Sequence, residues 1–449
     1  MVLPGTVLPL VLVIGTSVRS AGPGLGLKAP EIASVLTSDS QPVGSGMATR
    51  SFDVVIAGGG LAGSSLGGVL ARSGLGVLVV EKESGFRDRI RGELTFPWGH
   101  YEALRAGLRE PLDQVGVVAL PVIDFYHDGQ CVDSQRWETI SIDALPAIGF
   151  SHPRLQEVAL TWAESQGATV LRPAKVVEVS DGNRPSVSVV RDGRATEFQA
   201  RLAVGADGKR SGARRWLRAD TMTDPEHHWF GGLLLSDVHW DDTFGWAVTP
   251  AAAVGWFTTG ADSCRVYIRL TADQVRETGV GRTADTFIAF AAKFVPEGTL
   301  DDARQAGPMG FFPNSCTWSS CIALGHMVLV GDAAGALDPT QGLGTSLLFR
   351  DVRALSELLL ADGDWDRATS EFAKQRQTYY EVLRAYDRWC ALLDAEQGPQ
   401  ADRRRELNAA AREADPTLGG FAILEACGPD GLVPDDAARR MYFGEQSLR

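Results

Sequence analysis

The stretch Phe52-Asp-Val-Val-Ile-Ala-Gly58-Gly59-Gly60-Leu61-Ala62-Gly63 contains the residues that decide the fold. Its first half is a continuous run of mostly apolar, β-branched residues, which is typical of a buried strand. Its second half carries the spacing G-x-G-x-x-G, and a helical pattern follows as far as Arg72. A strand, a tight glycine turn and a helix in this order predict a phosphate-binding βα unit.

The residues that follow extend this unit. A second apolar strand runs from Gly76 to Val80 and ends at Glu81, 18 residues past Gly63, with Lys82 next. Gly58 permits the tight turn, Gly60 allows the backbone to approach a pyrophosphate, and Gly63 allows close packing of helix on strand. Leu61 and Ala62 present backbone N–H groups at the helix N-terminus, and Glu81 can accept hydrogen bonds from ribose hydroxyls. We therefore predict a bound dinucleotide.

Two later strands end in polar or glycine-rich segments. Residues 202–205 are apolar and lead into Ala206-Asp207-Gly208, with Ser211 and Arg214 opening the next predicted helix. Residues 327–330 lead into Gly331-Asp332 and then into Pro339-Thr340-Gln341-Gly342-Leu343-Gly344 and a long helix. Three strands thus end where phosphate or sugar groups can bind.

With these three motifs in this order, the chain resembles single-component FAD-dependent monooxygenases of the para-hydroxybenzoate hydroxylase type. They share their mode of FAD binding with flavin-dependent halogenases. The resemblance covers nearly everything from Phe52 to about Gln397. It implies FAD as the cofactor. It also implies an α/β fold in which a Rossmann-like FAD-binding domain is interleaved with a mixed or antiparallel β-sheet substrate domain and followed by a helical C-terminus.

The resemblance also implies roles for single residues. Asp332 matches the acid that binds the ribityl chain, and the loop containing Pro339, Gly342, Leu343 and Gly344 matches the backbone that lies against the isoalloxazine ring. Asp207 and Gly208 match a pair that serves both FAD and NAD(P)H. Arg91 matches an arginine near the pyrophosphate and Arg154 another FAD contact, with a surface ion pair as the alternative for each. Two positions depart from the family pattern: Gly335 stands where many members have His, and Ser346 where many have Asn.

The middle of the chain predicts the substrate domain. Residues 175–179, 186–191 and 196–199 have the pattern of small antiparallel strands, and aromatic residues are dense from Trp229 to Trp256. We expect the latter segment to form a sheet facing the flavin and lining an apolar pocket. The alternative is that its aromatic residues only pack the sheet against helices.

Candidate catalytic groups are few. His228, His239 and Tyr267 fall in this region and could assist proton transfer, although a hydrogen-bonded core histidine is the more common outcome. His227 and His228 are adjacent, so on a strand they would point to opposite faces, and we expect no metal site.

Composition limits the partners. The 449 residues carry a net charge of −13, which disfavours nucleic acid as a ligand. Six cysteines without a C-x-x-C pair predict reduced thiols and a cytoplasmic protein.

The apolar run from Val7 to Gly15 is too short for a membrane span, and no Lys or Arg precedes it. Residues 1–46 are therefore interpreted as a disordered extension or a misassigned start rather than a secretory signal. The oligomeric state stays open.

The remaining chain divides into predicted segments. Residues 47–175 form the first part of the FAD-binding domain with insertions of the substrate domain, 176–200 a small antiparallel β segment, and 201–220 the Asp-Gly segment. Residues 221–320 form the substrate-binding sheet, 321–362 the Gly-Asp segment with its helix, and 363–449 the C-terminal helices. The cluster Arg403-Arg404-Arg405 is interpreted as a solvated helix face.

The resemblance implies a reaction as well. Such enzymes use NADH or NADPH and O2 to hydroxylate or epoxidise a small molecule through a flavin C4a-hydroperoxide. We expect an apolar or aromatic substrate and a role in specialised metabolism. The alternatives are a flavin-dependent halogenase, a reductase of an apolar chain, and a cyclase in which FAD is structural. Halogenation is disfavoured because no lysine occurs between Lys82 and Lys175, where halogenases place a required one.

Overall fold

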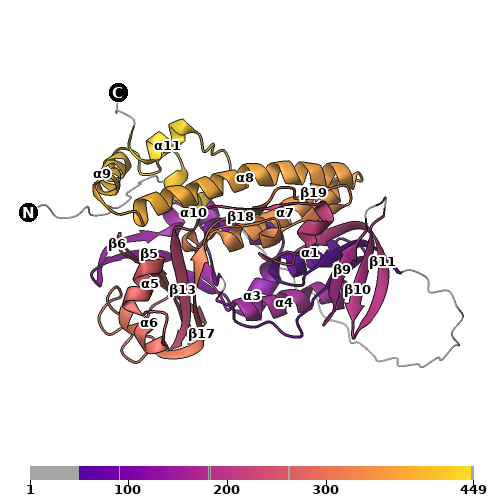
Figure 1. Cartoon of the computed structure of the whole chain (residues 1–449), viewed down its shortest axis with the longest axis horizontal. Coiled ribbons are helices and arrows are strands. Elements are labelled where there is room, and N and C mark those ends of the chain that lie inside the picture. The colour runs from indigo at the N-terminus through magenta and orange to yellow at the C-terminus, as the bar shows by residue number, and fades with distance from the viewer. Residues whose placement is uncertain (1–49, 91, 181, 183, 261–262, 446–449) are drawn as a thin grey trace, which may run out of the picture.

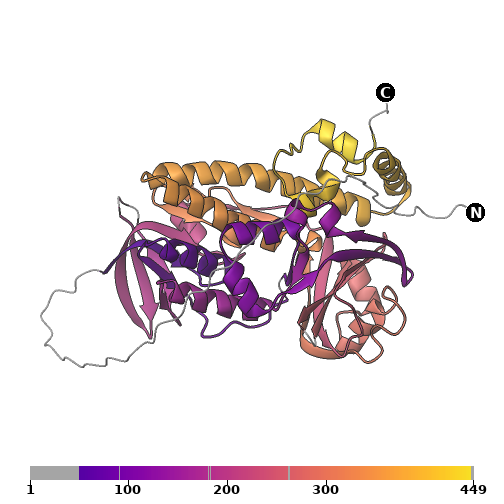
Figure 2. The same cartoon turned by 180° about the vertical axis from the view of Figure 1, so that it is seen from behind.

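The computed structural model describes residues 50–445 except 91, 181, 183 and 261–262. The predicted tail 1–46 lies outside the described residues. Figures 1 and 2 show an elongated molecule in which one half contains an α/β sheet and the other a second sheet, while the long helix α8 (Trp365–Asp394) runs along both. The predicted fold class is confirmed.

The first sheet is built around the glycine motif. Its order is β19-β20-β11-β1-β2-β8, and the strands are β1 (Arg50–Ala57), β2 (Val77–Val80), β8 (Thr169–Leu171), β11 (Arg194–Gly205), β19 (Ala323–Leu324) and β20 (Met327–Leu329). Pairing from β20 to β8 is parallel throughout. Strands β9 (Lys175–Val179) and β10 (Ser186–Arg191) extend the sheet as an antiparallel flap on β11.

Helices bury one face of this sheet and short segments bury the other. The helices α1 (Leu61–Arg72), α3 (Arg109–Val115), α4 (His152–Ser165) and α7 (Gly344–Ala361) share a core with β1 and β2. On the other face, β9, β10 and the 3-10 helix η3 (Ala213–Leu217) cover a second core. Both faces are therefore apolar, which explains why the strands read as continuous apolar runs rather than alternating ones.

The strand β11 corrects two expectations. Residues 196–199 and 202–205 belong to this single strand, so the predicted boundary between 200 and 201 cuts through it. Its first half pairs antiparallel with β10, while residues from Phe198 to Gly205 pair parallel with β1. The flap 176–200 is thus continuous with the FAD-binding sheet. The segment after Asp207 forms the short 3-10 helix η3 and not an α-helix.

The second sheet has the order β17-β13-β16-β15-β14-β5-β6. Its strands are β5 (Val122–His127), β6 (Gln130–Arg136), β13 (His228–Ser236), β14 (Phe244–Val248), β15 (Ala253–Gly260), β16 (Ser263–Leu270) and β17 (Arg304–Asn314). Helices α5 (Ala272–Thr278) and α6 (Ala284–Ala291) cover one face, which we call the outer face. The opposite, inner face packs against residues of the predicted flavin loop and of α8.

Two three-stranded sheets and several short turns connect these layers. One sheet contains β3 (Leu94–Thr95), β7 (Ala147–Gly149) and β4 (Val118–Leu120), and the other contains β12 (Thr221–Thr223), β18 (Thr317–Ser319) and β21 (Gly335–Ala336). Helix α2 (Pro97–Arg105) and the 3-10 helices η1 (Trp137–Thr139), η2 (Ile142–Ala144), η4 (Gly331–Ala333) and η5 (Pro339–Gln341) lie in the same connections. They place the glycine-rich loops between the two large sheets.

The C-terminal third is helical. After α8 come α9 (Pro399–Ala414), the 3-10 helix η6 (Phe421–Ile423), α10 (Leu424–Cys427) and α11 (Asp436–Tyr442). The basic cluster has a structural role that differs from the expected solvated face: Arg404 and Arg405 donate to the carbonyl oxygens of Leu392 and Leu393, at 3.1 and 2.7 Å. These bonds satisfy carbonyl groups that α8 leaves unpaired at its C-terminal end.

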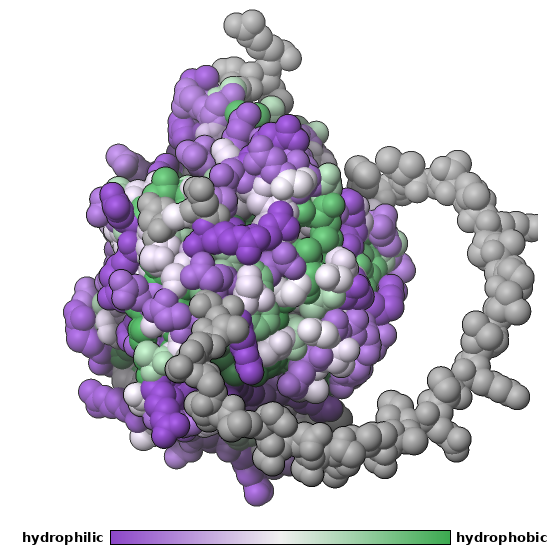
Figure 3. Space-filling model, turned by 90° about the vertical axis from the view of Figure 1, so that its right-hand side faces the viewer, coloured by the Kyte–Doolittle hydropathy of each residue, from purple (hydrophilic) through white to green (hydrophobic). Residues whose placement is uncertain are grey.

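The surface is mostly polar. Figure 3, which views the end of the molecule that carries β9, β10 and β19, shows hydrophilic side chains with apolar patches between them. Val177 and Leu324 are exposed apolar residues at this end. Among the described residues, no helix is both long enough and apolar enough to cross a bilayer.

Candidate active site

The three predicted motifs meet at one edge of the first sheet. Ala57 is in register with Gly205 on one side and with Val80 on the other, and Gly205 is in register with Leu329. The residues that follow these strands therefore emerge together at their carboxyl ends, which is where α/β sheets bind ligands. This edge brings together Gly58, Glu81, Asp207 and Asp332.

The glycine turn requires residues without side chains. Gly58 has a φ of +110°, and a Cβ there would lie 2.4 Å from the carbonyl oxygen of Ala206. At Gly63 a Cβ would lie 1.9 Å from the carbonyl oxygen of Gly58, so α1 can approach the turn only with glycine. Gly60 precedes the first residue of α1, which leaves the N–H groups of Leu61 and Ala62 at the helix start.

Glu81 holds this turn directly. Its Oε2 accepts a hydrogen bond from the Gly59 N–H at 2.7 Å, and its Oε1 accepts one from the Glu83 N–H at 2.8 Å. Glu81 is buried, whereas Lys82 is exposed. The sequence predicted a ribose contact for Glu81, and the structure adds a second role, because the carboxylate also orients the backbone of the glycine turn.

The Asp-Gly segment has a half-buried carboxylate, Asp207, with one buried oxygen that accepts no hydrogen bond. Asp207 Oδ2 accepts from the N–H groups of Gly212 (2.6 Å) and Ala213 (3.2 Å), which caps the segment leading into η3. Asp207 Oδ1 is buried and accepts no hydrogen bond, and the hydroxyl of Ser211 is also buried without a partner. Such orphaned polar atoms suit a ligand that donates and accepts hydrogen bonds.

Arg214 joins the Asp-Gly and Gly-Asp segments. Its guanidinium donates to the carbonyl oxygens of Ala333 (2.9 Å), Asp332 (3.1 Å) and Lys209 (3.1 Å). Burial lowers the pKa of Arg214, although the nearby carboxylates of Asp207 and Asp332 oppose this. The sequence placed Arg214 only at the start of a helix, and its bridging role depends on the packing of β11 beside β20.

Two helices, α7 and α8, hold the Gly-Asp segment in place through hydrogen bonds to its backbone. The Gly331 N–H donates to Asp351 of α7 at 2.8 Å, and Arg376 of α8 donates to the carbonyl oxygen of Gly335 at 3.1 Å. The unusual Gly335 is explained by packing, because a Cβ there would lie 3.1 Å from the Tyr380 ring. The unusual Ser346 is fully buried, and its hydroxyl lies 3.0 Å from that of Thr95.

The predicted flavin loop leaves open space at its helix end. Pro339 begins η5, Gly342 has a φ of +65°, and Leu343 is buried. A Cβ on Gly344 would meet no protein atom within 4 Å, and the same is true at Gly208. FAD belongs in such a cradle, and the free N–H groups at α1, the orphaned Asp207 oxygen and the open space at Gly344 fit it. The predicted role of Asp332 at the ribityl chain stays a prediction.

The structure describes one of the two predicted arginines. Arg91 lies outside the described residues. Arg154 is exposed in the first turn of α4. Gln156, two positions later, is buried, and its Nε2 would lie 3.3 Å from a Cβ on Gly60. Sequence reasoning missed Gln156, and its place in the same helix opening as Arg154 was the signal that could have found it.

The inner face of the second sheet is aromatic. Phe230, Phe244, Phe257 and Tyr267 share one core with Leu337 and Leu343 of the flavin-loop region. Tyr267 stacks on Phe230 with ring centroids 5.0 Å apart, and burial raises its pKa well above the usual value. The neutral phenol is therefore the stable form, so Tyr267 can donate a hydrogen bond but is a poor base.

The aromatic residues of this segment divide between the two faces of the sheet, and their predicted role as the lining of a substrate pocket stays a prediction. Phe230, Phe244 and Trp246 face the flavin-loop side. Trp240 and Trp256 lie on the outer side with α5 and α6, and their rings meet edge to face at 5.2 Å. Period-two alternation along the strands separates the two sets.

A charged cluster on the inner face was not anticipated. Arg265, fully buried, pairs with Glu93 and with Asp88, the latter at 2.7 Å. Burial raises the pKa of Glu93, and Arg265 opposes that rise. Arg265 stands two residues before Tyr267 on β16, so both side chains leave the same face of the sheet. A buried arginine in an apolar strand was the available sequence signal.

The side chains of the histidines lie in places that the sequence did not fully predict. His228 is buried, with Nε2 2.8 Å from the hydroxyl of Thr340 and 3.0 Å from Asp338 Oδ2. His227 was expected to face away, but it precedes β13, where strand alternation does not apply, and its ring contacts that of His228 with the Nδ1 atoms 2.6 Å apart. With Asp338 they form a group of three side chains of metal-ligating type, which the sequence did not anticipate, and the expectation of no metal site stays a prediction. His239 is exposed beside Asp302, outside this group.

Asp338 is the anionic member of this cluster. Burial alone would raise its pKa, but hydrogen bonds from His228 and from the Thr340 N–H lower it to about 2. The carboxylate caps η5, the first turn of the flavin loop. Thus His228 supports the loop through Asp338 and Thr340.

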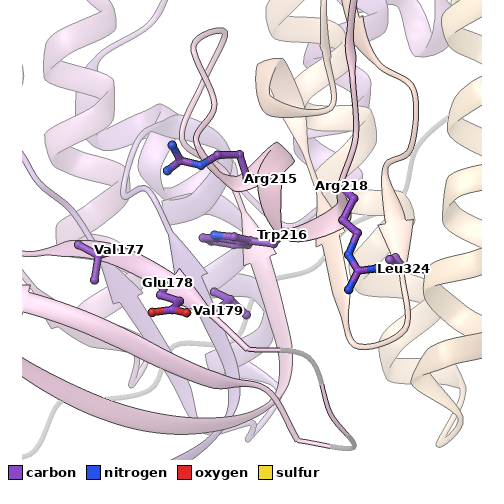
Figure 4. A pocket seen from close by; sticks show the side chains of 7 residues that line it. All are labelled: Val177, Glu178, Val179, Arg215, Trp216, Arg218 and Leu324. Atoms are coloured by element: carbon purple, nitrogen blue, oxygen red, sulfur yellow. The ribbon is translucent and has the colours of Figure 1, made fainter.

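A separate pocket of about 360 Å³ lies on the far side of the Asp-Gly segment. Figure 4 shows Arg215, Trp216 and Arg218 of η3 and its C-terminal end facing Glu178 of β9 and Leu324 of β19. None of the predicted cofactor or catalytic residues lines it. It is therefore distinct from the edge where the motifs meet.

Comparison with known proteins agrees with this geometry. The profile of the FAD binding domain family matches residues 51–364. The chain belongs to this family of FAD-dependent enzymes. It is an FAD-dependent oxidoreductase of the monooxygenase type, as predicted.

Curated relatives are distant. A digeranylgeranylglycerophospholipid reductase of Methanospirillum hungatei is 25% identical over 306 residues, covering 66% of this chain and 72% of that protein. A squalene monooxygenase of Panax ginseng is 24% identical over 343 residues, covering 74% of this chain and 62% of that protein. A mitochondrial ubiquinone biosynthesis monooxygenase of Drosophila melanogaster is 26% identical, covering 78% and 84%.

Solved structures share the fold. A p-nitrophenol 4-monooxygenase of Pseudomonas putida superposes with a TM-score of 0.70 at 19% identity, covering 83% of this FAD-dependent enzyme and 99% of that chain. A flavin-dependent brominase superposes with a TM-score of 0.69 at 17% identity, covering 87% and 98%. The fold is thus common to oxygenating and halogenating enzymes.

Proposed function

We propose that this enzyme uses NADH or NADPH and O2 to insert one oxygen atom into an apolar or aromatic small molecule. The observation that carries this proposal is the inner face of the second sheet. There Phe230, Phe244 and Phe257 pack in one core with Leu343 of the flavin loop. Apolar surface next to a flavin binds apolar substrates and excludes water from the reacting atoms.

The residues of the chain have distinct tasks in this reaction. The N–H groups at the start of α1 bind the pyrophosphate, Glu81 holds the glycine turn, and the loop ending at Gly344 supports the ring system. When bound there, FAD would supply the redox chemistry between the nicotinamide and oxygen. Tyr267 is on the same inner face, and burial raises the pKa of its phenol well above the usual value, so in this proposal it acts as a hydrogen-bond donor and not as a base.

The names of the relatives agree with an apolar or aromatic substrate. Squalene is a hydrocarbon, and p-nitrophenol is an aromatic ring. The inner face offers aromatic rings and one neutral phenol, together with the paired Arg265. We therefore propose a substrate that is largely apolar and carries at most a few polar groups.

The test is substrate-stimulated oxidation of NADH or NADPH by the FAD-loaded enzyme under 18O2. We expect products heavier by one 18O atom. Phe257→Ala on the inner face should raise KM for the substrate, whereas Phe290→Ala, which removes a half-buried ring from α6 on the outer side, should not. An enzyme that oxidises neither nicotinamide with any apolar candidate would contradict the proposal.

A reductase is the second candidate. It is favoured by the similarity to the digeranylgeranylglycerophospholipid reductase, which covers 66% of this chain. The same assay separates the two, because a reductase forms its product without oxygen and incorporates no label. Chloride or bromide in the assay, with a halogen mass shift in the product, would instead establish halogenation.

A further inference from the structure

The pocket beside η3 has a lining that the proposed reaction does not use. Its volume of about 360 Å³ lies within the range of small-molecule binding sites. It opens between η3, the antiparallel flap and the edge strand of the first sheet (Figure 4). The side chains that matter for binding are Arg215, Trp216 and Arg218 on one side, with Val177, Glu178 and Leu324 facing them.

Two arginines make this pocket attractive to an anion. Arg215 and Arg218 are exposed, and within the part of the chain that the structure describes neither guanidinium pairs with a carboxylate. Figure 4 shows the two side chains on either side of Trp216. In a protein of net charge −13, an anionic ligand needs such a local group of unpaired basic side chains. Guanidinium groups bind phosphate through two parallel hydrogen bonds, so phosphate is the anion that this pair suits best.

Trp216 adds a flat apolar surface that the fold holds in place. The indole is half-buried against the core under the flap, and its ring lies 3.8 Å from where a Cβ on Gly205 would stand. Beside it, Val177 and Leu324 are 42% and 45% exposed, although both are aliphatic. An anchored indole with exposed aliphatic neighbours favours a ligand that carries a flat ring, because nucleic acid bases stack on tryptophan.

Glu178 determines how such a ligand would lie. Its exposed carboxylate lines the same pocket as Trp216 and, among the described residues, forms no ion pair. A carboxylate repels phosphate but accepts hydrogen bonds from hydroxyl and amino groups. The phosphate would therefore lie at the arginines, and the sugar hydroxyls or the amino group of the base would lie at Glu178.

We propose that this pocket binds a purine nucleotide, with the base on Trp216 and the phosphate on Arg215 and Arg218. Two sources supply this chemistry: a free nucleotide, and the adenosine end of a nicotinamide dinucleotide. The site is separate from the edge where the three motifs meet, since none of the predicted cofactor residues lines it. The proposal does not depend on the reaction proposed above.

The test uses the FAD-loaded enzyme, in which the cofactor edge is already occupied. Calorimetry measures the binding of ADP and of NADP+, which cannot reduce the flavin. The variants are Arg218→Ala and Trp216→Leu, the second of which keeps an apolar side chain against the core. Arg388→Ala is the matched control, because Arg388 is an exposed arginine of α8 that pairs with no carboxylate among the described residues. Flavin absorbance shows that each variant is folded and loaded.

We expect one ADP per chain in wild type and in Arg388→Ala, and binding about tenfold weaker in Arg218→Ala and in Trp216→Leu. If NADP+ displaces ADP, the adenosine end of the dinucleotide occupies the pocket, whereas ADP binding without such competition assigns the pocket to a free nucleotide. Absence of ADP binding in wild type, or equal ADP affinity in wild type and in both pocket variants, would overturn the proposal.

Discussion

At the cofactor edge of the sheet, glycines matter as much as residues with polar or charged side chains. Gly58 and Gly63 are forced by backbone atoms within 2.4 Å of where a Cβ would stand. Gly344 differs, because a Cβ there would meet no protein atom within 4 Å. The protein itself therefore tolerates a side chain at Gly344, and only a ligand bound in that space would clash with it.

This contrast gives a prediction for Gly344→Ala. The FAD-free variant should be as stable as wild type or more stable by about 0.5–1 kcal/mol, since alanine is favoured over glycine in a helix. Its affinity for FAD should fall about tenfold or more, a loss of ~1.4 kcal/mol or more. Fluorescence titration of the FAD-free protein measures the affinity, and chemical denaturation measures the stability.

Gly363→Ala is the matched control, because a Cβ there also meets nothing within 4 Å but lies in the turn between α7 and α8, away from the motifs. Unchanged FAD affinity in Gly344→Ala would show that the ring system does not lie against this residue.

Among the elements, α7 and α8 do more than cover the sheet. Asp351 of α7 and Arg376 of α8 form a buried pair at 2.9 Å, and the Tyr379 hydroxyl donates to Asp351 at 2.7 Å. The same two side chains bond to the backbone of Gly331, which begins the Gly-Asp segment. Two helices thus position a cofactor loop through one ion pair.

We expect Arg376→Met to destabilise the protein by about 3–5 kcal/mol, because Asp351 would be left as an unpaired buried charge. The free energy of unfolding from chemical denaturation measures this. FAD release should also occur at lower denaturant than in wild type.

Arg367→Met on the same helix is the control. Arg367 pairs with Asp362 at the surface, and exposed pairs contribute little. A small effect of Arg376→Met, similar to that of Arg367→Met, would contradict the role assigned to the buried pair.

In the whole molecule, α8 connects all the layers. Arg384 pairs with Asp224 beside the substrate sheet, and Tyr386 donates to Glu425 of α10 at 2.6 Å (Figure 1). Burial raises the pKa of Glu425 to about 7, although the Tyr386 hydrogen bond opposes the rise. We therefore expect the docking of the C-terminal helices on α8 to be sensitive to pH.

The direction in which stability changes with pH follows from proton binding by Glu425 in the folded and unfolded states. A carboxyl group with a raised pKa holds its proton more tightly in the folded state, so its stabilisation is complete below about pH 4.5 and is lost as the pH rises through about 7. Stability of wild type should thus fall between pH 5 and 8, and Glu425 should account for up to ~3 kcal/mol of that fall.

Glu425→Gln should remove this part of the pH dependence, because the amide is neutral throughout and can still accept from Tyr386. The measurement is the free energy of unfolding at several pH values, with exposed Glu413→Gln on α9 as control. Parallel stability curves for wild type and Glu425→Gln would contradict the assignment.

Much of the cofactor site could be predicted from local sequence. The run from Phe52 to Gly63 and the strand ending at Glu81 form one strand–turn–helix–strand unit. Residues close together in the sequence are enough to recognise it. The turn and the helix α1 followed from it, whereas FAD as the cofactor followed from the resemblance that three motifs along the chain carry, and these predictions are confirmed. The split of aromatic residues between the two sheet faces was not predicted, because alternation shows two faces without showing which one meets the flavin loop.

By itself, the sequence determined the glycine turn and helix α1, since these depend on residues within about thirty positions of one another, and it indicated FAD through three motifs spread along the chain. Only the tertiary structure decided that residues 196–205 form one strand, that Arg376 holds the Gly-Asp segment, and that His227 and His228 meet Asp338. Arg376 and Gly335 are 41 residues apart, and His228 and Asp338 are 110 apart, so no local period encodes these contacts. They exist because two sheets and two helices pack around a common core.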